Sequence, residues 1–326
     1  MELRILSGHD IAELLPMDAC IELMARTMAA VSEGRARFPP RAAAPAAPGG
    51  LLAWMPGSLD DPACFGVKLL SLFPGNPAAG ISSHLGLVVL FEAEHGRPVA
   101  LLDAAEITAI RTAAVSGLAT RLLARPDAGD LAILGAGEQA ASHLAAMRAV
   151  RPVRRVRVWS RTEASARAFA EAQAAKHGLD IEVAPSAQAA VNDADLVCTV
   201  TAAREPVLAG DWIAPGAHLN VVGASRPDAT EIDTAAVVRS RYFVDCRAST
   251  EREAGDWLRA LEAGAVRPDH IAAELGEVVN GTRPGRRSAE EITLFRSLGV
   301  AAEDLAAASY VLDEARRRGA GQTAEL

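Results

Sequence analysis

The sequence predicts an α/β protein in which a doubly wound parallel sheet follows an α+β domain. Two observations carry this prediction. Residues 130–222 alternate short apolar runs with helical segments, as parallel strands and their crossover helices do. Residues 51–103 instead contain strand-like runs separated by glycine and proline turns, which is typical of an antiparallel or mixed sheet. At 326 residues the chain is long enough for two such domains.

The first domain is expected to begin with two helices. Ser7 and Asp10 can cap a short helix, and residues 17–33 carry apolar side chains at helical spacing. The Pro/Ala-rich residues 39–50 should then run over the surface in extended form. Strands are expected at 51–55, 64–71, 84–92 and 98–103. A long amphipathic helix at 106–124 should close the domain.

The second domain is expected after a junction at 125–129, where arginine, proline and glycine interrupt the pattern. Strands are expected at 130–134, 153–159, 182–184, 196–199, 219–222 and 242–245, with helices between the early ones. We therefore expect one domain at 1–124, rejoined by the C-terminal segment 300–326, and a second at 125–299. The helical pattern at 301–317 should pack its alanine-rich face back on the first domain.

Composition excludes several classes of protein. A formal net charge of −8 argues against a nucleic-acid partner, which usually requires a basic face. No apolar run reaches the roughly 18 residues that span a bilayer, and the N-terminus lacks the apolar core of a signal peptide. The four cysteines are widely separated, so we expect neither a structural metal site nor a disulfide framework. A cytoplasmic metabolic protein without a membrane partner fits these features.

Residues 131–140 have the pattern of a dinucleotide-binding turn between a strand and a helix. In this Gly-x-Gly-x-x-Ala motif, Gly135 permits the tight turn, Gly137 lets the backbone approach a pyrophosphate, and Ala140 allows close packing. The pyrophosphate would bind the N–H groups at the helix start. A glycine motif alone is equally compatible with an ordinary turn. With the strand that follows, it favours a Rossmann-type domain.

The end of that following strand indicates which dinucleotide binds. Ser160, Arg161 and Thr162 stand where NAD-binding folds place a carboxylate on the ribose 2′-hydroxyl. Hydroxyl and guanidinium groups suit a 2′-phosphate, which a carboxylate would repel. The alternative is that Arg161 merely lies in a solvated turn. We therefore expect NADPH as the preferred cofactor, with NADH as the alternative.

Two basic residues lie in segments that should be buried. Lys68, one of two lysines in the chain, lies in an apolar strand, where a charge needs an anionic partner or a lowered pKa. Such a lysine suits a substrate carboxylate or proton exchange with an imine, whereas an edge-strand lysine facing water is the alternative. Arg111 lies on a helix face of small residues, where arginine has either a bound anion or an internal ion pair. Arg41 is a weaker candidate, because solvation alone explains it.

Taken together, several motifs resemble the ornithine cyclodeaminase/mu-crystallin family over nearly the whole chain. They are Gly66-Val-Lys68, Phe73-Pro-Gly-Asn76, Leu90-Phe-Glu92 and the segments 111–116, 134–140, 223–228, 273–279 and 293–299. The resemblance implies that the first domain, with the C-terminal helix, binds substrate and forms a homodimer. It also implies that the middle domain binds the dinucleotide and that the active site lies between the two. The apolar strands of the first domain agree with a dimer.

The resemblance also implies roles for individual residues. It places Arg41, Lys68 and Arg111 around the substrate carboxylate, with Lys68 nearest the chemistry. With the glycine turn and the ribose corner, the expected cofactor contacts are Ser83, Arg111, Thr112, Gly135, Ala136, Gly137, Glu138, Gln139, Ser160, Arg161, Thr162, Thr201, Ser225, Ser297 and Leu298. Ser297 and Leu298 are expected near the nicotinamide.

One departure from the family narrows the reaction. Ornithine cyclodeaminases have a catalytic aspartate at the position of Ser225 and a lysine at that of Ala229, and this chain has neither. The Ser-Arg-Pro-Asp form instead resembles the ketimine reductase and pyrroline-2-carboxylate reductase branch. Asp228 is either a substitute acid or a turn cap.

We therefore expect NAD(P)H-dependent reduction of a cyclic ketimine carboxylate to a cyclic imino acid such as proline or pipecolate. Three alternatives remain open. They are an ammonia-releasing cyclodeaminase, reductive amination of a 2-oxo acid as in alanine dehydrogenases, and a cofactor-bound ligand-binding protein without turnover.

Overall fold

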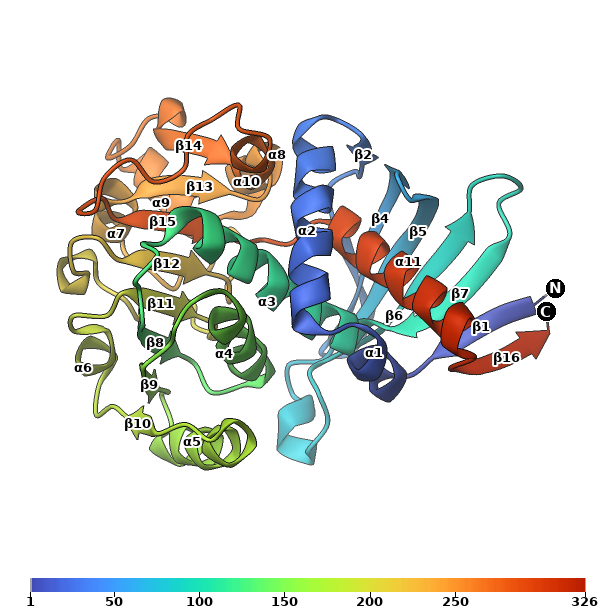
Figure 1. The fold of residues 1–326 in the computed structure, drawn as a ribbon, viewed down its shortest axis with the longest axis horizontal. Helices are drawn as coiled ribbons and strands as arrows, with labels where there is room; N and C mark the ends of the chain where they lie inside the picture. Colours follow the sequence, from blue (N-terminus) through green and yellow to red (C-terminus); the bar gives the residue numbers. More distant parts are fainter. Residues whose placement is uncertain (1, 326) are drawn as a thin grey trace. The chain divides into compact units, whose positions relative to one another are not determined.

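A computed structural model describes residues 2–325, apart from the side chains at 47, 77, 78 and 84, and it divides into two compact units (Figure 1). Unit 1 contains the chain up to Arg111 and again from Gly299, and unit 2 contains Thr112–Leu298. The division falls inside helix α3 (Ala104–Leu123). We expected the boundary after this helix, but α3 is continuous and carries the chain from one unit into the other.

Unit 1 is built on an eight-stranded mixed sheet in the order β16-β1-β7-β6-β5-β4-β2, with β3 also pairing β4. The strands are β1 (Glu2–Leu6), β2 (Ala36–Arg37), β3 (Ala42–Ala47), β4 (Gly50–Asp60), β5 (Ala63–Leu72), β6 (His84–Glu92), β7 (Pro98–Asp103) and β16 (Gln322–Glu325). The β1–β7 pair is parallel, and the other pairs are antiparallel. The expected mixed sheet is therefore confirmed.

Three helices, the first part of α3 and a short 3₁₀ turn, η1 (Asn76–Ala79), complete the described part of unit 1. Helix α1 (Gly8–Leu14) has the predicted Ser7–Asp10 capping box, and α2 is Met17–Ser32. Helix α11 (Ala301–Arg318) packs against α2 and across β4, β5 and β6 (Figure 1). The return of this alanine-rich helix to the first unit confirms the prediction.

Residues 39–50 are extended and mostly at the surface, as expected, and they also contribute β3, which pairs along β4. The expected end of the next strand at residue 55 was wrong. Strand β4 continues to Asp60, so Pro56 and Gly57 lie inside it, opposite Val67 and Gly66. Backbone of the sheet and helix α11 together explain the glycines. A Cβ at Gly66 would collide with the Val89 carbonyl oxygen and lie 2.8 Å from Leu305 Cδ2, and one at Gly57 would lie 3.2 Å from both the Arg37 carbonyl oxygen and Ala301 Cβ.

Unit 2 contains an eight-stranded sheet whose strands are all parallel, in the order β10-β9-β8-β11-β12-β15-β13-β14. The strands are β8 (Asp130–Leu134), β9 (Arg155–Trp159), β10 (Ile181–Val183), β11 (Leu196–Thr199), β12 (His218–Val221), β13 (Arg241–Val244), β14 (Ile271–Glu274) and β15 (Thr293–Arg296). The strand order reverses between β8 and β11, which is the switch point of a doubly wound sheet. The predicted Rossmann-type fold class is confirmed.

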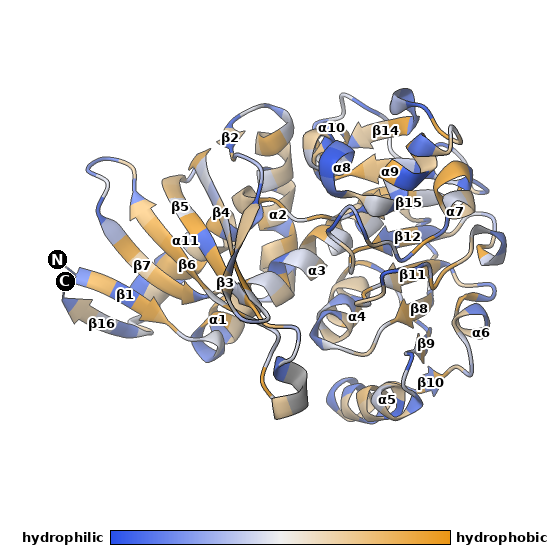
Figure 2. Cartoon of the chain, turned by 180° about the vertical axis from the view of Figure 1, so that it is seen from behind, coloured by the Kyte–Doolittle hydropathy of each residue, from blue (hydrophilic) through white to orange (hydrophobic). Residues whose placement is uncertain are grey.

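The helices of unit 2 connect these strands. They are α4 (Glu138–Val150), α5 (Glu163–His177), α6 (Ala187–Val191), α7 (Thr234–Arg239), α8 (Arg247–Glu253), α9 (Gly255–Glu262) and α10 (Leu275–Val279), with 3₁₀ turns η2 (Gly210–Trp212) and η3 (Pro268–His270). Hydrophobic residues concentrate in the strands, most clearly in β6, β7 and β8 (Figure 2). Within residues 2–325, no helix is long and apolar enough to cross a membrane.

The C-terminal end of α3 is held by two arginine side chains of unit 2, Arg151 and Arg286. Arg151 donates to the carbonyl oxygens of Thr120, Ala124 and Arg125 at 2.9, 3.0 and 2.9 Å. Arg286 donates to the carbonyl of Leu123 at 2.6 Å. The last carbonyls of a helix lack intrahelical partners, and cations there also favour the helix dipole.

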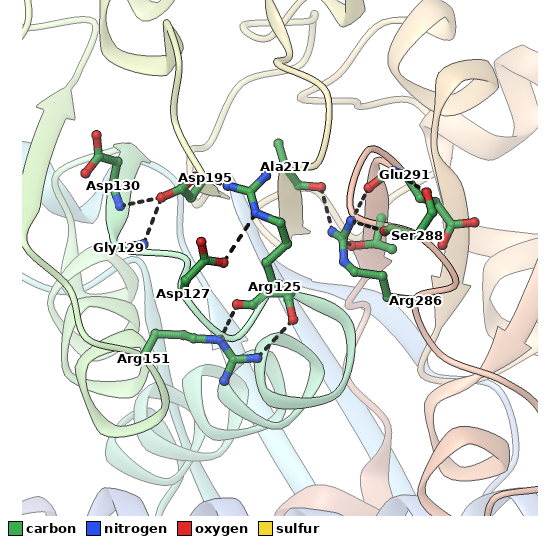
Figure 3. Close-up of polar contacts among 12 residues, drawn as sticks. Arg125, Asp127, Gly129, Asp130, Arg151, Asp195, Ala217, Arg286, Ser288 and Glu291 are labelled. Carbon is green, nitrogen blue, oxygen red and sulfur yellow. Dashed lines mark hydrogen bonds and ion pairs between the residues drawn. The ribbon is translucent and has the colours of Figure 1, made fainter.

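The expected junction at 125–129 is itself an ordered polar turn (Figure 3). Asp195 forms an ion pair with Arg125 and accepts hydrogen bonds from the backbone N–H groups of Gly129 and Asp130, at 2.8 and 3.0 Å. These contacts connect the start of β8 to the segment before β11. The end of α3 is thus fixed within unit 2.

Candidate active site

A buried cluster of four charged side chains connects β5, α3 and α11 in unit 1. Lys68 Nζ lies 3.0 Å from Asp304 Oδ1, and Arg111 Nε lies 2.9 Å from the same oxygen. Arg111 Nη1 donates to Glu303 Oε2 at 2.5 Å. Lys68 and Arg111 are 2% and 4% exposed, and both acids are fully buried. Two cations therefore face two anions away from water.

The position of Lys68 follows from the register of the sheet. It pairs with Met55 of β4 and Val88 of β6, both of which are buried. Directly paired residues project from the same face of a sheet, and this face also carries Gly66, over which α11 passes. Strand β5 is internal, so the alternative of an edge-strand lysine facing water is wrong.

Several polar atoms of this cluster retain unused hydrogen-bonding capacity. Within the described part of the chain, Lys68 Nζ has one partner although an ammonium has three donors. Arg111 Nη2 donates no hydrogen bond to the described residues, and Asp304 Oδ2 is buried there without a partner. Unpaired buried polar groups are costly, and they are typical of sites that take a polar ligand.

The buried surroundings of Lys68 bring its pKa closer to neutral pH. Burial lowers the pKa of Lys68 to about 8, with Asp304 opposing this shift and Arg111 and Arg41 adding to it. Burial acts to raise the pKa of Asp304, but Arg111 and Lys68 hold it below its usual value. The cluster thus combines a permanent carboxylate with an amine that can donate or accept a proton.

Arg41 and Ser83 also belong to unit 1. Arg41, half-buried just before β3, donates from Nη2 to the carbonyl oxygen of Gly299 at 2.7 Å. Ser83 lies between η1 and β6, where its carbonyl accepts the N–H of Phe73 at 2.9 Å. Arg41, Lys68 and Arg111, which the family resemblance places around the substrate carboxylate, all lie in unit 1, and their role in substrate binding stays a prediction. The role of Ser83 in cofactor binding stays a prediction.

The glycine turn of unit 2 has the geometry that its motif predicts. Gly135 has φ +120°, and a Cβ there would lie 2.6 Å from the Val200 carbonyl oxygen. Around Gly137, a Cβ would meet no described atom within 4 Å. Helix α4 begins directly afterwards, and its N-cap residue is Gly137, which has no side chain to cap the helix. A helix start with open space at its N-cap residue fits the pyrophosphate of a dinucleotide. Ala136, Glu138 and Gln139 line this turn in the sequence.

The corner after β9 carries an unpaired cation. Ser160 is half-buried, whereas Arg161 and Thr162 are exposed. Within residues 2–325, Arg161 has neither a hydrogen bond nor an ion pair, and Thr162 does not cap α5 with its side chain. Strand β9 lies beside β8, which precedes the glycine turn. The guanidinium of Arg161 is thus available for an anion.

Glu231 organises the loops after β11 and β12, and sequence reasoning missed it. Its Oε1 accepts the N–H and hydroxyl of Thr201 at 2.6 and 2.7 Å, and its Oε2 accepts the Gly223 N–H at 2.6 Å. Burial raises its pKa, against the hydrogen bonds that favour the anion. A carboxylate in the small, apolar segment 229–232 was the available signal. Glu231 thereby fixes Thr201, an expected cofactor contact.

Arg296 organises a second part of the same sheet edge. This fully buried side chain pairs with Asp256 at 2.7 Å and donates to the carbonyl oxygens of Ser297 and Ala224. Ser225 follows Ala224 directly. Ser297 Oγ is buried without a partner among the described atoms, and the Leu298 N–H is held by Asp245. Ser225, Ser297, Leu298 and Thr112 remain predicted cofactor contacts.

Asp228 was expected to be either a substitute acid or a turn cap, and the structure shows an ion pair instead. It forms a two-armed ion pair with Arg226, both contacts being 2.9 Å, at an exposed position. The hydrogen bond from Arg226 lowers its pKa, so it is a carboxylate at neutral pH. A substitute acid would need its proton. Asp228 is therefore better described as the anion of a surface ion pair.

Glu92, Glu94 and His95 come close enough together for their ligand atoms to share an ion. The Glu92 carboxylate is already used by the turn after β6, where it accepts the N–H groups of Glu94 and His95 at 2.6 and 2.9 Å. These backbone hydrogen bonds lower the pKa of Glu92 to about 2. The group is thus a turn cap.

The chain is similar in sequence and in structure to proteins of one family. Residues 1–319 match the ornithine cyclodeaminase/mu-crystallin family. The ketimine reductase mu-crystallin of Mus musculus is 42% identical over 264 residues, covering 81% of this chain and 80% of the mouse protein. The Thermococcus litoralis Delta(1)-pyrroline-2-carboxylate reductase in complex with NADH and L-proline has a TM-score of 0.95 at 36% identity, over 98% of this chain and 99% of that one. An archaeal alanine dehydrogenase dimer with bound NAD has a TM-score of 0.93 at 30% identity over 100% of both chains.

Proposed function

Because the chain belongs to the ornithine cyclodeaminase/mu-crystallin family, we propose that it is a nicotinamide-dependent reductase of cyclic ketimine carboxylates. The product is a cyclic imino acid such as proline or pipecolate. One observation carries the proposal: in the buried Lys68–Arg111–Asp304 cluster, Lys68 Nζ and Arg111 Nη2 have donor capacity that the described residues do not use and that an anionic imine substrate would use. Ser225, in place of the cyclodeaminase aspartate, favours reduction over ammonia release.

We assign substrate binding to unit 1. Arg111 and Arg41 bind and orient the carboxylate, since guanidinium groups match its planar geometry. Lys68 keeps the imine nitrogen protonated, which makes the adjacent carbon accept hydride more readily. The nicotinamide, when bound, supplies the hydride, and the protein supplies position and charge.

We assign cofactor binding to unit 2, with NADPH preferred over NADH. Support comes from the open turn at Gly137 and from Arg161, which has no partner within residues 2–325. A 2′-phosphate would gain charge-assisted hydrogen bonds there, whereas NADH offers only a hydroxyl. Two structurally similar proteins hold NADH or NAD. The preference of this chain for NADPH is therefore tested separately, with the Arg161→Ala variant.

We propose that the protein acts as a homodimer in the cytoplasm. The face of the unit 1 sheet opposite α11 exposes Leu52, Phe65, Leu85 and Leu87 by 38% to 46%. An apolar sheet face of this kind is typical of an interface. The four cysteines are free thiols, which supports a reducing compartment.

A parallel assay tests the reaction class. NADPH oxidation would be followed with five- and six-membered cyclic ketimine carboxylates, and with pyruvate plus ammonia. Ammonia release would be followed with ornithine and NAD. The proposal predicts that cyclic ketimines have the highest kcat/KM by at least about tenfold, since one misplaced group in a polar site costs that much. A higher value for pyruvate would favour the alanine dehydrogenase alternative, which the second solved structure motivates.

A further inference from the structure

Asp304 accepts both cationic contacts of the cluster on a single oxygen. Its Oδ1 lies 3.0 Å from Lys68 Nζ and 2.9 Å from Arg111 Nε, and the residue is fully buried in the first turn of α11. The shared oxygen fixes the distance between the ammonium and the guanidinium. We propose that Asp304 is a positioning residue that holds the Lys68 ammonium at the point of proton delivery. The catalytic part of this inference rests on the proposed reductase function.

The need for such a residue follows from the surroundings of Lys68. Its paired neighbours Met55 and Val88 are apolar and buried, so they cannot stabilise a charge. An ammonium in such surroundings loses its proton unless an anion compensates. Arg111 and Arg41 face it with the same sign and favour the neutral amine.

The remaining titratable groups near the cluster do not replace Asp304. Glu303, the adjacent residue of α11, reaches Arg111 Nη1 and the Val300 N–H. Cys20 of α2 is a neutral thiol, because burial and Glu303 raise its pKa. Asp304 is thus the anion that contacts Lys68 directly. Glu303 contributes a second negative charge to Arg111, so Asp304 does not have to compensate the guanidinium alone while it also contacts the lysine.

The chain allows a direct measurement, because its lysines are Lys68 and Lys176. A Lys176→Arg background, labelled with ¹³Cε and ¹⁵Nζ lysine, gives one side-chain signal whose NMR titration reports Lys68. In this parent protein we expect a midpoint of about 8. Asp304→Asn should lower the midpoint by about 1 to 3 units, the usual effect of removing an adjacent opposite charge.

Glu303→Gln is the matched control, since it removes an equally buried charge from the same helical turn. Glu303→Gln should lower the titration midpoint of Lys68 by less than half of the shift that Asp304→Asn produces. An unchanged midpoint in Asp304→Asn, or equal shifts in both variants, would overturn the inference.

The Asp304→Glu variant distinguishes the effect of the negative charge from the effect of its position. It also tests the inference if Asp304→Asn does not fold. It keeps the negative charge but moves the carboxylate by one methylene, so the Lys68 midpoint should stay within about 1 unit of the parent. The value of kcat for ketimine reduction should fall about tenfold or more with little change in KM, because proton delivery depends on position. Parent-like kcat would contradict the positioning role.

The titration is done without substrate or cofactor, so its result does not depend on the reaction. If Asp304→Asn shifts the midpoint but no cyclic ketimine is reduced, the proposed function fails while the Asp304–Lys68 relation stands. If ketimines are reduced and the alkaline limb of the kcat/KM profile is the same in Asp304→Asn and the parent, the inference fails and the function stands. We expect the alkaline limb to move to lower pH in step with the NMR midpoint.

Discussion

Lys68 and Asp304 form a buried ion pair although 236 positions separate them in the sequence. The pair exists because α11 returns to unit 1 and passes over Gly66, where the absence of a Cβ leaves room for Leu305. The C-terminal helix therefore supplies Glu303 and Asp304, the two anions of the buried four-residue cluster. This relationship connects the fold to the chemistry that we propose.

Replacing the lysine should separate catalysis from cofactor binding. In Lys68→Met we expect kcat/KM for cyclic ketimines to fall about 10²- to 10⁴-fold, the usual worth of a general acid. The affinity for NADPH, measured by fluorescence titration, should change little, because the glycine turn belongs to unit 2. Lys176→Met, at the end of α5, is the control and should behave as wild type. Wild-type turnover by Lys68→Met would remove the lysine from the mechanism.

The ribose corner should determine the choice between NADPH and NADH. Arg161→Ala should reduce the NADPH-to-NADH ratio of kcat/KM by about 10- to 100-fold, which corresponds to roughly 1.5 to 3 kcal/mol for charge-assisted hydrogen bonds. Arg167→Ala is the control, since Arg167 is already paired with Glu163 on α5. Equal ratios in wild type and Arg161→Ala would show that the guanidinium does not read the phosphate.

The exposed apolar face of unit 1 should form the dimer contact. Leu87→Asp should convert the dimer to a monomer at micromolar concentration, because a buried, unpaired carboxylate costs several kcal/mol. Light scattering gives the mass directly. Val238→Asp, an equally exposed aliphatic position on α7 of unit 2, should leave the dimer intact. The assignment is refuted by a wild-type monomer or by a Leu87→Asp dimer of unchanged stability.

Two buried histidines should make the protein acid-sensitive. Burial lowers the pKa of His143 to about 4 and that of His218 to about 3. Below their unfolded pKa of about 6.5, the unfolded chain binds protons that the folded chain does not. The free energy of unfolding should therefore fall by about 1.4 kcal/mol per pH unit for each histidine between pH 6 and 4. Urea unfolding at several pH values measures this slope.

His143→Gln provides the internal comparison for that slope. The ring donates from Nδ1 to the Gln139 carbonyl at 2.7 Å, so Nε2 accepts the Ser116 hydroxyl at 2.9 Å. A glutamine can offer one donor and one acceptor without titrating. The variant should lose about half of the acid sensitivity in this range. An unchanged slope would mean that His143 does not carry the effect.

Much of the fold was predictable because the strands are apolar runs between clear turns. The bounds of β6, β7, β8 and β11 agree with the sequence-based expectation. Strand β15 was missed, since it is four residues long and ends in Arg296, a charge that is tolerated because Asp256 pairs with it. Strands β1 and β16 were missed because each pairs with a distant segment, which local pattern does not reveal.

The candidate site was predictable only on its cationic side. An apolar strand around Lys68 and a small-residue helix around Arg111 signal burial locally. Glu303 and Asp304 carry no such signal, because acidic residues in a first helical turn ordinarily stabilise the helix dipole. Their partners lie 192 and 236 positions away. The remaining signal in the sequence was indirect: two buried cations require anionic partners somewhere in the chain.

Transfer of deuterium from NADPH labelled on its reactive hydride position tests the central claim most directly. The wild-type protein would be incubated with the labelled cofactor and a cyclic ketimine carboxylate, and the product analysed by mass spectrometry and NMR. We predict a cyclic imino acid carrying one deuterium on the carbon of the former C=N bond, and almost none in Lys68→Met. A product without deuterium at that carbon, or no product at all while ornithine is cyclised with release of ammonia, would contradict the account.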